Sequence, residues 1–511
     1  MAGGGKNGSF IGSSIGRIIG GIDVGSTGAK ISVFDEQGNL LHTGYRDYPV
    51  SRHLSAHEID ANQIREAVLA LLREAAAREP GLCAVGIATF GESFVLLGDG
   101  DRVLYPAMMY TDPRGTEEIA ELKAQFGEDW LCATTGVAPH SMFSLPKLMW
   151  IRKHEPEVFS AIRQVLLMED YVAYLLTGER VIDYSLAART MAFDIRTLDW
   201  SRELLQAAGI PLEWMSRVVP TGTLAGTIRP DLAERLGLPR GLAVVACCHD
   251  QVAAAVGAGV LKPGMATDGS GTVECMTPVF TEYDRGGSLQ KNNYALVPFL
   301  HKGTYVSYAF IFTGGSLVKW FLDTLAGNDQ ATARAKGISV YAQLESQMAD
   351  KPTGILVLPH FAGAATPYMD TGSKGGIVGL TLENSSAELY RAILEGVGYE
   401  MAVNIERLRD SGIQISSLHA TGGGAKSELW LQMKADILNL PVHRMDVAEA
   451  GTVGVILLTG AATGVYDDLE KAARTLVGVQ KTFWPRREQH EAYSVYYERY
   501  RKLYQAIRPL V

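Results

Sequence analysis

Residues 240–276 read RGLAVVACCHDQVAAAVGAGVLKPGMATDGSGTVECM and show the order of elements on which the fold depends. The apolar run at 241–248 predicts a buried strand, and the small residues at 252–260 predict a helix that can pack closely against a neighbour. A second strand follows at 265–276 and includes an acidic residue and a Gly/Ser/Thr loop. This stretch therefore predicts a strand, a helix and a strand-loop unit in succession.

The start of the chain repeats the strand-and-loop theme. Residues 17–24 (RIIGGIDV) and 29–35 (AKISVFD) predict two strands joined by a Gly/Ser/Thr turn. The pair IDVGST and TDGSGT resembles an internal duplication with one copy in each half of the chain, although short repeats of turn residues also arise by chance.

Helical and strand patterns alternate along the first half of the chain. An amphipathic helix is expected at 61–77, a buried strand at 84–90 and a further helix at 145–159. This alternation indicates an α/β architecture with a mostly parallel or mixed sheet. A chain of 511 residues is long enough for two domains with separate cores, so the cleft between them is the expected site.

Charge, hydropathy and cysteine content exclude several classes of protein. The 47 Lys and Arg residues against 56 Asp and Glu residues include no basic block that would hold a nucleic-acid backbone. No apolar run approaches the roughly 18 residues that cross a bilayer, and the first residues lack an apolar signal core. The five cysteines show neither an even count nor a metal-ligand spacing, which favours a reduced cytoplasmic setting.

The first glycine loop has residues that phosphoryl transfer requires, namely backbone amides for phosphate oxygens and a partner for a divalent cation. Gly25 lets the backbone approach a phosphate, and Ser26 and Thr27 offer hydroxyl and amide donors. Asp23 can hold Mg²⁺ directly or through water, and Lys30 can add positive charge. In isolation, the same residues also fit an ordinary hairpin turn.

Two further loops have the same character. The segment GSGT supplies Gly269, Ser270, Gly271 and Thr272, and a glycine cluster at 422–424 precedes a helix whose N-terminus favours an anion. Three such loops are harder to explain as turns than one. None has the GxxxxGK[ST] form, and no GxGxxG follows the first strand, which disfavours a P-loop or a dinucleotide-binding fold.

Asp250 is the candidate general base that would activate an accepting hydroxyl, because it follows a strand and can project into an interdomain cleft. The alternative is that Asp250 caps the next helix, which is a frequent use of Asp at such a junction. His249 is expected to be a hydrogen-bonded structural residue.

Two longer segments resemble a known family. MFSLPKLMWI (142–151) looks like the first signature of the FGGY carbohydrate kinases, and GGGAKSELWLQMKADILNLPV (422–442) looks like the second. The resemblance implies an actin-like ATPase fold, in which two ribonuclease-H-like domains close on each other. We therefore expect a flexible tail at 1–16, a sugar-binding domain with the first phosphate loop at 17–255, and an ATP-binding domain at 256–511.

The resemblance also implies roles for individual residues. Asp250 matches the base, and Asp23 belongs to the first phosphate motif. The residues implied in nucleotide binding are Gly25, Ser26, Thr27, Lys30, Gly269, Ser270, Gly271, Thr272, Gly314, Gly315, Gly422, Gly423, Gly424 and Ser427. Those implied in sugar binding are Gly91, Glu92, Ser93, Asp112, Arg114, Asp250 and Gln251.

These residues leave the substrate open between a ketose, an aldonate and a polyol. Glu92 and Gln251 resemble the glycerol kinase pattern, but Gly91 stands where glycerol kinases carry an arginine. Xylulokinases favour Met and His in this loop and Asn after the base, and neither feature appears. His140 and Tyr184 fall in regions that could face the cleft and are expected to be structural.

The activity that the resemblance implies is ATP-dependent phosphorylation of a hydroxyl on a small sugar or polyol, with Mg²⁺ as the metal and Asp250 as the base. A nucleotide-driven switch like actin or the Hsp70 chaperones shares the duplicated fold but needs no sugar pocket. A catalytically silent sugar sensor is expected to lose Asp250 or a phosphate loop, and all are present. A homodimer fits the resemblance, since dimers are common among related kinases.

Overall fold

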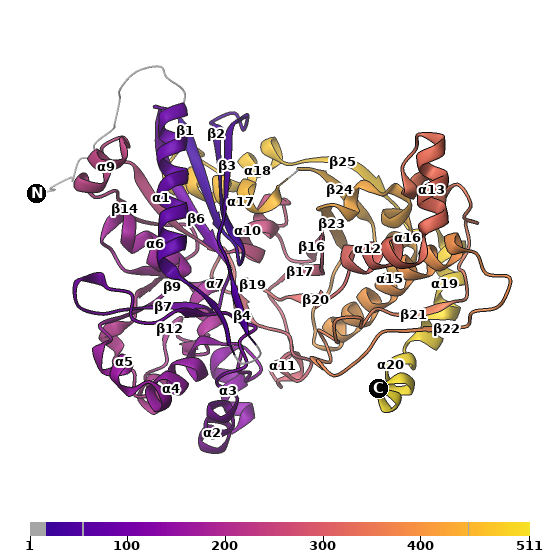
Figure 1. Ribbon diagram of the computed structural model, residues 1–511, viewed down its shortest axis with the longest axis horizontal. Helices are drawn as coiled ribbons and strands as arrows, with labels where there is room; N and C mark the ends of the chain where they lie inside the picture. The colour runs from indigo at the N-terminus through magenta and orange to yellow at the C-terminus, as the bar shows by residue number, and fades with distance from the viewer. Residues whose placement is uncertain (1–16, 54–55, 448) are drawn as a thin grey trace, which may run out of the picture.

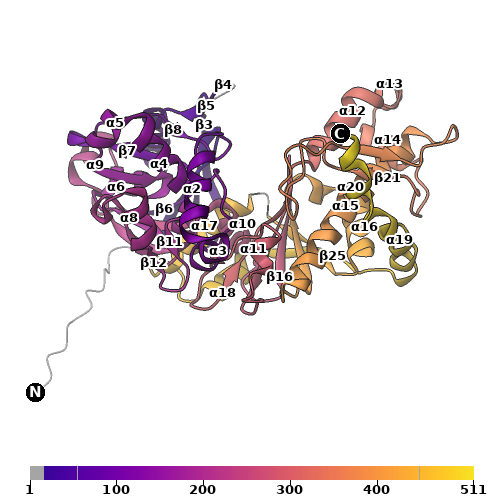
Figure 2. The same ribbon diagram turned by 90° about the horizontal axis from the view of Figure 1, so that it is seen from below.

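The computed structural model of the protein describes residues 17–53, 56–447 and 449–511, so the tail predicted at 1–16 lies outside the described residues. The described chain is a mixed α/β structure with two main sheets, which confirms the predicted fold class. We call the part built on the six-stranded sheet the first lobe and the part built on the eight-stranded sheet the second lobe. The two lobes lie side by side (Figures 1 and 2).

The sheet of the first lobe has the strand order β14-β15-β6-β1-β2-β3. Its strands are β1 (Ile18–Val24), β2 (Gly28–Asp35), β3 (Leu40–Asp47), β6 (Leu82–Thr89), β14 (Thr223–Thr227) and β15 (Ala243–His249). The central strands β1, β6 and β15 are parallel, whereas β2, β3 and β14 run antiparallel to their neighbours. The carboxyl ends of β1 and β15 therefore lie at one edge of the sheet, on either side of β6.

The sheet of the second lobe repeats this pattern. Its strands are β16 (Met265–Ser270), β17 (Glu274–Phe280), β18 (Val297–Pro298), β19 (Tyr305–Val306), β20 (Ala309–Ile311), β23 (Ser417–Thr421), β24 (Val442–Asp446) and β25 (Gly478–Phe483). Strand β16 pairs antiparallel with β17 and parallel with β23, as β1 pairs antiparallel with β2 and parallel with β6. A third parallel strand follows in each sheet, β15 or β24. This topology supports the internal duplication suggested by IDVGST and TDGSGT.

Helices cover both faces of the first sheet. Helix α1 (Ala61–Arg78) packs on β2 and β3, and its buried Ile64, Val68 and Leu71 have the spacing of the predicted amphipathic helix. Helix α6 (Met168–Thr177) joins α1 in one core, whereas α10 (Asp250–Gly257) and α17 (Ala450–Ala462) lie in another. Side chains of β15 alternate between the two cores, as expected for a strand buried on both faces.

The largest helices of the second lobe are α12 (Gly315–Leu325), α15 (Ser386–Asp410), α16 (Glu428–Leu438) and α19 (Arg487–Tyr500).

The shorter elements belong to both lobes. The other helices are α2 (Thr116–Phe126), α3 (Glu128–Thr135), α7 (Tyr184–Ala187), α8 (Arg202–Ala208), α9 (Pro230–Leu236), α11 (Ser288–Lys291), α13 (Gly327–Lys336), α14 (Val340–Glu345), α18 (Leu469–Leu476) and α20 (Leu503–Ile507). Short strands form small sheets: β4 (Ser51–His53) with β5 (Ala56–Ile59) and β8 (Ala107–Met108), β7 (Phe94–Leu97) with β9 (Gln164–Leu167), β10 (Val181–Asp183) with β13 (Arg217–Val219), β11 (Phe193–Asp194) with β12 (Asp199–Trp200), and β21 (Leu356–Leu358) with β22 (Gly376–Val378).

The helix predicted at 145–159 is wrong in one respect, because the structure divides it into two. Helix α4 (Ser144–His154) ends before Glu155, and α5 (Pro156–Ala161) begins at the next residue. Proline has no backbone N–H and disfavours a helical conformation of the preceding residue, so Pro156 suits the first position of a new helix and not the interior of a longer one.

The crossing of α10 and α17 confirms the close packing predicted for the small residues after Asp250. A Cβ atom at Gly257 would lie 1.7 Å from the carbonyl oxygen of Ala450, and one at Gly454 would lie 1.8 Å from that of Ala253. Helix α17 comes from the last part of the chain, yet it packs on β1 and β6 of the first lobe (Figure 1, yellow). The domain boundary predicted after residue 255 falls inside α10. The predicted division also assigns α17 to the ATP-binding domain, whereas α17 packs on the sheet of the first lobe.

The predictions on membrane-spanning segments and on the cysteines can be compared with the described residues. None of the helices in this part of the chain combines the length and apolar character needed to span a bilayer. All five cysteines are free, and the adjacent Cys247 and Cys248 are buried residues of β15.

We expect Gly454→Ala to lower the free energy of unfolding by about 1–3 kcal/mol, because the added methyl group overlaps the backbone of α10 and must separate the two helices. Denaturant-induced unfolding measures this change. Gly327→Ala is the matched control, since a Cβ atom there meets nothing within 4 Å, and it should change stability by less than about 1 kcal/mol. Equal unfolding midpoints for the two variants would contradict the proposed close contact.

Candidate active site

Asp250 lies where the sequence predicted, at the first position of α10 and directly after β15. The N-cap of α10 is His249, so Asp250 is not the cap residue of this helix. Its side chain is 35 % exposed, whereas its Oδ1 atom is buried and makes no hydrogen bond to the described residues, although Nδ1 of His249 lies 3.4 Å away. Burial raises the pKa of Asp250 to about 6, against the opposing effects of Gln251 and Arg189. A reachable carboxylate with this pKa suits a general base.

Asp23 lies near Asp250, because β1 and β15 end at the same edge of the first sheet. Burial, and next the negative charge of Asp250, raise the pKa of Asp23 to about 7, while Lys30 opposes this rise. The Nζ atom of Lys30 is 2.9 Å from Oε1 of Glu449, the N-cap residue of α17. The structure thus brings together the predicted base, the predicted metal ligand and Lys30, but Lys30 is paired with a carboxylate that sequence reasoning missed.

The loop after β6 holds the predicted sugar residues in a buried position. Glu92 adopts a left-handed backbone conformation with φ of 64° and pairs with Arg189, whose Nε donates to Oε1 of Glu92 at 2.6 Å. The Ser144 hydroxyl donates to the backbone oxygen of Glu92 at 2.6 Å, so the first signature segment supports this loop. A Cβ atom at Gly91 would lie about 3.0–3.1 Å from Arg189 and His249, which explains the glycine. Ser93 is fully buried beside it.

A small cavity of about 90 Å³ lies between residues of the two lobes. Arg189, His140 and Phe143 line it from the first lobe, and Tyr308 and Asn293 line it from the part of the chain that follows β17. The Tyr308 hydroxyl is buried without a hydrogen-bond partner in the described structure. The guanidinium of Arg189 lies 5.4 Å from the centroid of the Tyr308 ring. The rest of the lining is mostly apolar, so the cavity is an apolar pocket that holds a few polar groups with unused hydrogen-bonding capacity.

Sequence reasoning missed Arg189 and Tyr308, because neither belongs to a motif that it recognised. The position of Arg189 matters only through Glu92, which lies 97 residues earlier in the chain. His140 lines the cavity, and Tyr184 packs against Phe193 with ring centroids 5.9 Å apart; the expectation that both are structural stays a prediction.

Asp112 and Arg114 direct their polar groups mainly toward each other. The Nε atom of Arg114 donates to Oδ1 of Asp112 at 2.8 Å, and Arg114 also pairs with Glu58. The backbone N–H of His57 donates to the second Asp112 oxygen at 2.8 Å, and buried Lys147 donates to the Asp112 carbonyl at 2.6 Å. Hydrogen bonds from Arg114 hold the pKa of Asp112 below its usual value against the effect of burial. These contacts favour a role in shaping the loop, and sugar contact by either side chain stays a prediction.

Three of the four predicted nucleotide segments meet in the second lobe. The N–H groups of Gly315 and Gly314 donate to the carbonyl oxygens of Gly271 and Thr272 at 2.9 and 3.1 Å. A Cβ atom at Gly422 would lie 2.7 Å from the carbonyl oxygen of Ser270, so only glycine allows this approach. The loops at 269–272, 314–315 and 422–424 are therefore packed on one another.

The remaining nucleotide-binding predictions fall at the margins of this cluster. Ser427 is the N-cap residue of α16 and accepts a hydrogen bond from the N–H of Trp430 at 3.2 Å. Gly25, Ser26 and Thr27 form the β1–β2 turn in the first lobe, where the Tyr48 hydroxyl donates to the carbonyl of Gly25.

An open groove of about 710 Å³ runs along the glycine cluster. Gly422, Gly423 and Lys426 line it on one side, and Arg444 of β24 and Glu449 after that strand line it on the other. Because Glu449 pairs with Lys30 of the first lobe, the groove extends from the nucleotide loops of the second lobe to the region of Asp23. Its dimensions and its backbone amides suit a nucleotide with its phosphates toward the first lobe.

Comparison with known proteins places this site in a family context. Residues 18–257 match the model of the FGGY family of carbohydrate kinases, N-terminal domain, and residues 271–463 match that of the C-terminal domain. The chain is 30 % identical to the xylulose kinase of Escherichia coli (strain K12) over 96 % of this chain and 99 % of that protein.

It is 27 % identical to the autoinducer-2 kinase of Escherichia coli O9:H4 over 95 % of this chain and 93 % of that protein. The crystal structure of a xyloylose kinase from Brucella ovis is similar to this structure with a TM-score of 0.86 and 28 % identity, over 97 % of this chain and all of that chain.

Sugar-dependent ADP formation, the activity that the sequence predicts, should fall as the pH drops through about 6. The base must be ionised to accept a proton, and burial raises the pKa of Asp250 to about 6, so the protonated and inactive form accumulates below that pH. We expect kcat/KM to fall by about tenfold per pH unit on the acid side. Initial rates between pH 5 and 8 measure the profile, with circular dichroism as the control for folding. A flat profile down to pH 5 would rule out this assignment.

Proposed function

This chain belongs to the FGGY family of carbohydrate kinases, and we propose that it transfers the γ-phosphoryl group of ATP to a hydroxyl of a small neutral sugar or polyol, with Asp250 as the general base. The observation that carries the proposal is the position of Asp250. Its carboxylate is partly exposed, with Nδ1 of His249 3.4 Å from Oδ1, and the His249 ring lies 5.3 Å from the ring of Tyr308, which lines the pocket.

In this mechanism the Asp250 carboxylate accepts the proton of the sugar hydroxyl. The hydroxyl oxygen forms its bond to the γ-phosphorus while the bond from that phosphorus to the leaving oxygen of ADP breaks. Backbone amides of the loops at 25–27, 269–272 and 422–424 would bind phosphate oxygens, where negative charge must be stabilised.

The charges near Asp23 fit a divalent cation. Burial is the largest cause of the raised pKa of Asp23, the negative charges of Asp250 and Glu449 add to it, and the positive charge of Lys30 opposes it. Within the described ranges, no group of three or more His, Cys, Asp or Glu side chains is arranged to hold a metal ion. Mg²⁺ needs only one or two carboxylates when phosphates and water supply its other ligands. Asp23 would hold this ion, which would offset the charge of the transferred phosphoryl group.

The charge balance of the pocket favours a neutral substrate. Arg189 is the cation that lines the cavity, and its charge is already paired with Glu92. A carboxylate group brought next to Glu92 and Asp250 would therefore meet two negative charges and no free positive one. The Tyr308 hydroxyl, which is buried and has no hydrogen-bond partner in the described structure, can be satisfied by a hydroxyl group of the substrate. We infer a neutral ketose or polyol, and xylulose is the first compound to test because relatives carry that name.

Replacing the base tests the assignment directly. Asp250→Asn keeps the shape of the side chain and removes its ability to accept a proton, so we expect kcat to fall by about 10² to 10⁴. A coupled ADP-release assay measures the rate, and binding of ADP to the variant, measured by calorimetry, is the control for an intact nucleotide site. A variant that keeps more than about a tenth of the wild-type turnover would exclude Asp250 as the base.

A panel of ketoses, polyols and aldonates tests the charge argument. We expect at least one neutral compound to exceed every aldonate by about 100-fold in kcat/KM. Glu92→Gln frees the charge of Arg189 and should shift the ratio of aldonate to neutral activity upward by about tenfold. An aldonate as the best substrate of the wild type would contradict the neutral pocket, and the absence of ADP release with all compounds would favour the switch or sensor alternatives.

A further inference from the structure

The second lobe contains a buried lysine that the proposed mechanism does not use. Lys434 of α16 is fully buried, and its Nζ atom lies 2.7 Å from Oδ2 of Asp268 and 2.6 Å from the hydroxyl of Ser270. It also forms an ion pair with Glu274, and its ammonium lies 4.5 Å from the centroid of the Trp430 ring. One side chain from α16 therefore binds both strands of the β16–β17 hairpin, on either side of the loop at 269–272.

The composition of this cluster argues against a role in stability alone. Two buried carboxylates share one ammonium, and Oδ1 of Asp268 and Oε2 of Glu274 have no hydrogen-bond partner among the described residues. Burial and the charge of Asp268 raise the pKa of Glu274 well above its usual value, despite Lys434. Buried ion pairs are often no more stabilising than apolar residues of the same volume, whereas they can define one geometry.

The geometry in question is that of the nucleotide loops. Ser270 is the last residue of β16, and its backbone oxygen faces Gly422 at the close approach described above. Beyond Ser270, the carbonyls of Gly271 and Thr272 accept hydrogen bonds from the start of α12. The hydroxyl of Ser270 accepts a hydrogen bond from Lys434 and donates one to Oε1 of Glu274 at 2.7 Å, so these bonds and the occupied carbonyls restrict the conformation of the exposed tip of the loop.

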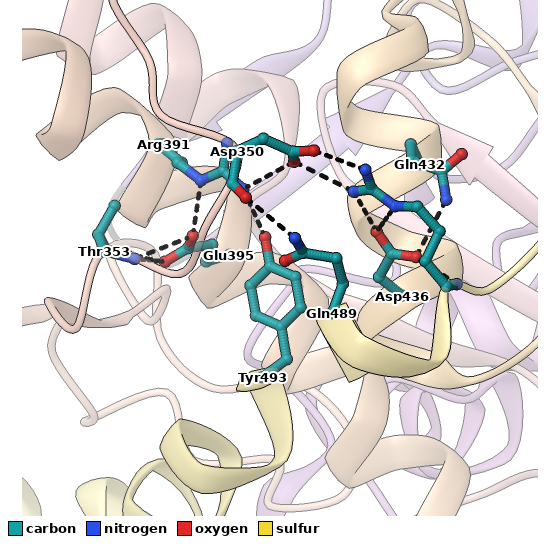
Figure 3. A network of polar contacts seen from close by, with 9 residues as sticks. Asp350, Thr353, Arg391, Glu395, Gln432, Asp436, Gln489 and Tyr493 are labelled. Carbon is teal, nitrogen blue, oxygen red and sulfur yellow. Dashed lines mark hydrogen bonds and ion pairs between the residues drawn. The ribbon is translucent and has the colours of Figure 1, made fainter. Parts of the chain in front are cut away.

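Helix α16 is itself held from its other side, so it can serve as a fixed support. Asp436, two residues after Lys434, accepts hydrogen bonds from the backbone N–H of Arg486 at 2.8 Å and from its Nη2 at 2.7 Å. Arg486 also pairs with Asp350, and Gln432 of α16 donates to Asp436 at 3.0 Å (Figure 3). This network ties α16 to the segment before α19, while Lys434 points into the lobe.

We propose that Lys434 is a positioning residue for nucleotide binding, which holds the loop at 269–272 in the conformation that presents its amides to the phosphates of ATP. This inference rests on the proposed function, since it takes that loop as a phosphate-binding loop. Lys434 acts through Ser270 and does not touch the nucleotide.

Lys434→Met should raise the KM for ATP by at least about tenfold, because it removes one or more charged hydrogen bonds to the loop. It should change the KM for the sugar by less than about twofold. Lys147→Met is the matched control, because Lys147 is an equally buried lysine of the first lobe that supports the Asp112 loop. It should leave the KM for ATP within about twofold of the wild type. Steady-state kinetics with each substrate varied measure both constants.

Two further variants separate positioning from simple charge balance. Lys434→Met/Asp268→Asn removes one charge of each sign, so a recovered KM for ATP would mean that Lys434 only neutralises carboxylates and would overturn the proposal. If Lys434→Met does not fold, Ser270→Ala removes the hydroxyl that Lys434 holds and should raise the KM for ATP by about threefold or more. An unchanged KM for ATP in Ser270→Ala would also overturn the proposal. A wild-type enzyme without ATP-dependent activity would instead remove the proposed function on which this inference rests.

Discussion

The crossing of α10 and α17 is the constraint on which the arrangement of the site depends. The two helices come from distant parts of the chain and touch through their backbones at Gly257 and Gly454, so neither can move without moving the other. Each helix starts at the proposed site, α10 with Asp250 and α17 directly after Glu449. The contact therefore fixes the distance between Asp250, the proposed base, and the carboxylate of Glu449 that pairs with Lys30, although no direct bond joins those side chains in the described structure. Small residues at the crossing are thus a requirement of the site as well as of packing.

The two lobes contribute different chemistry to this arrangement. The first lobe supplies ionisable groups at the ends of β1 and β15, and burial raises the pKa values of both Asp23 and Asp250. The second lobe supplies neutral backbone groups from glycine loops that pack on one another. The cavity that we propose for the sugar has residues from both, because Arg189 belongs to the first lobe and Tyr308 follows β17. A site divided in this way becomes complete only when both lobes are in place, which is the physical basis for excluding water from the transferred group.

Local patterns in the sequence were sufficient to predict the helices and strands near the site and the polar residues that follow the strand ends. The strand before Asp250, the helix after it and the glycine loops all lie where periodicity and turn residues predicted them, since these features depend on neighbours in the chain. Contacts between distant segments could not be predicted in this way. Arg189 meets Glu92 across 97 residues, and Lys30 meets Glu449 of α17, so each is an ordinary charged residue until the fold is known. Proline at 156 already indicated a helix break in the sequence, but the helical spacing of the apolar residues around it led to the prediction of one continuous helix.

The duplicated hairpins show how equal positions acquire different roles. Asp23 and Asp268 occupy matching places in IDVGST and TDGSGT, each on the first strand of an antiparallel pair. Asp268 is fully buried against Lys434, which takes up its charge and ties it to the hairpin. Asp23 has no such lysine beneath it; its nearest positive group, Lys30, is itself paired with Glu449, and the neighbouring Asp250 adds negative charge. The surplus negative charge at the first hairpin suits the proposed cation, whereas at the second hairpin Lys434 lies between Asp268 and Glu274 and joins its two strands. An acidic residue followed by a glycine loop therefore predicts a phosphate-binding turn. Whether the acidic side chain is free for a cation or supports the loop depends on a side chain from a distant helix, as Lys434 shows for Asp268.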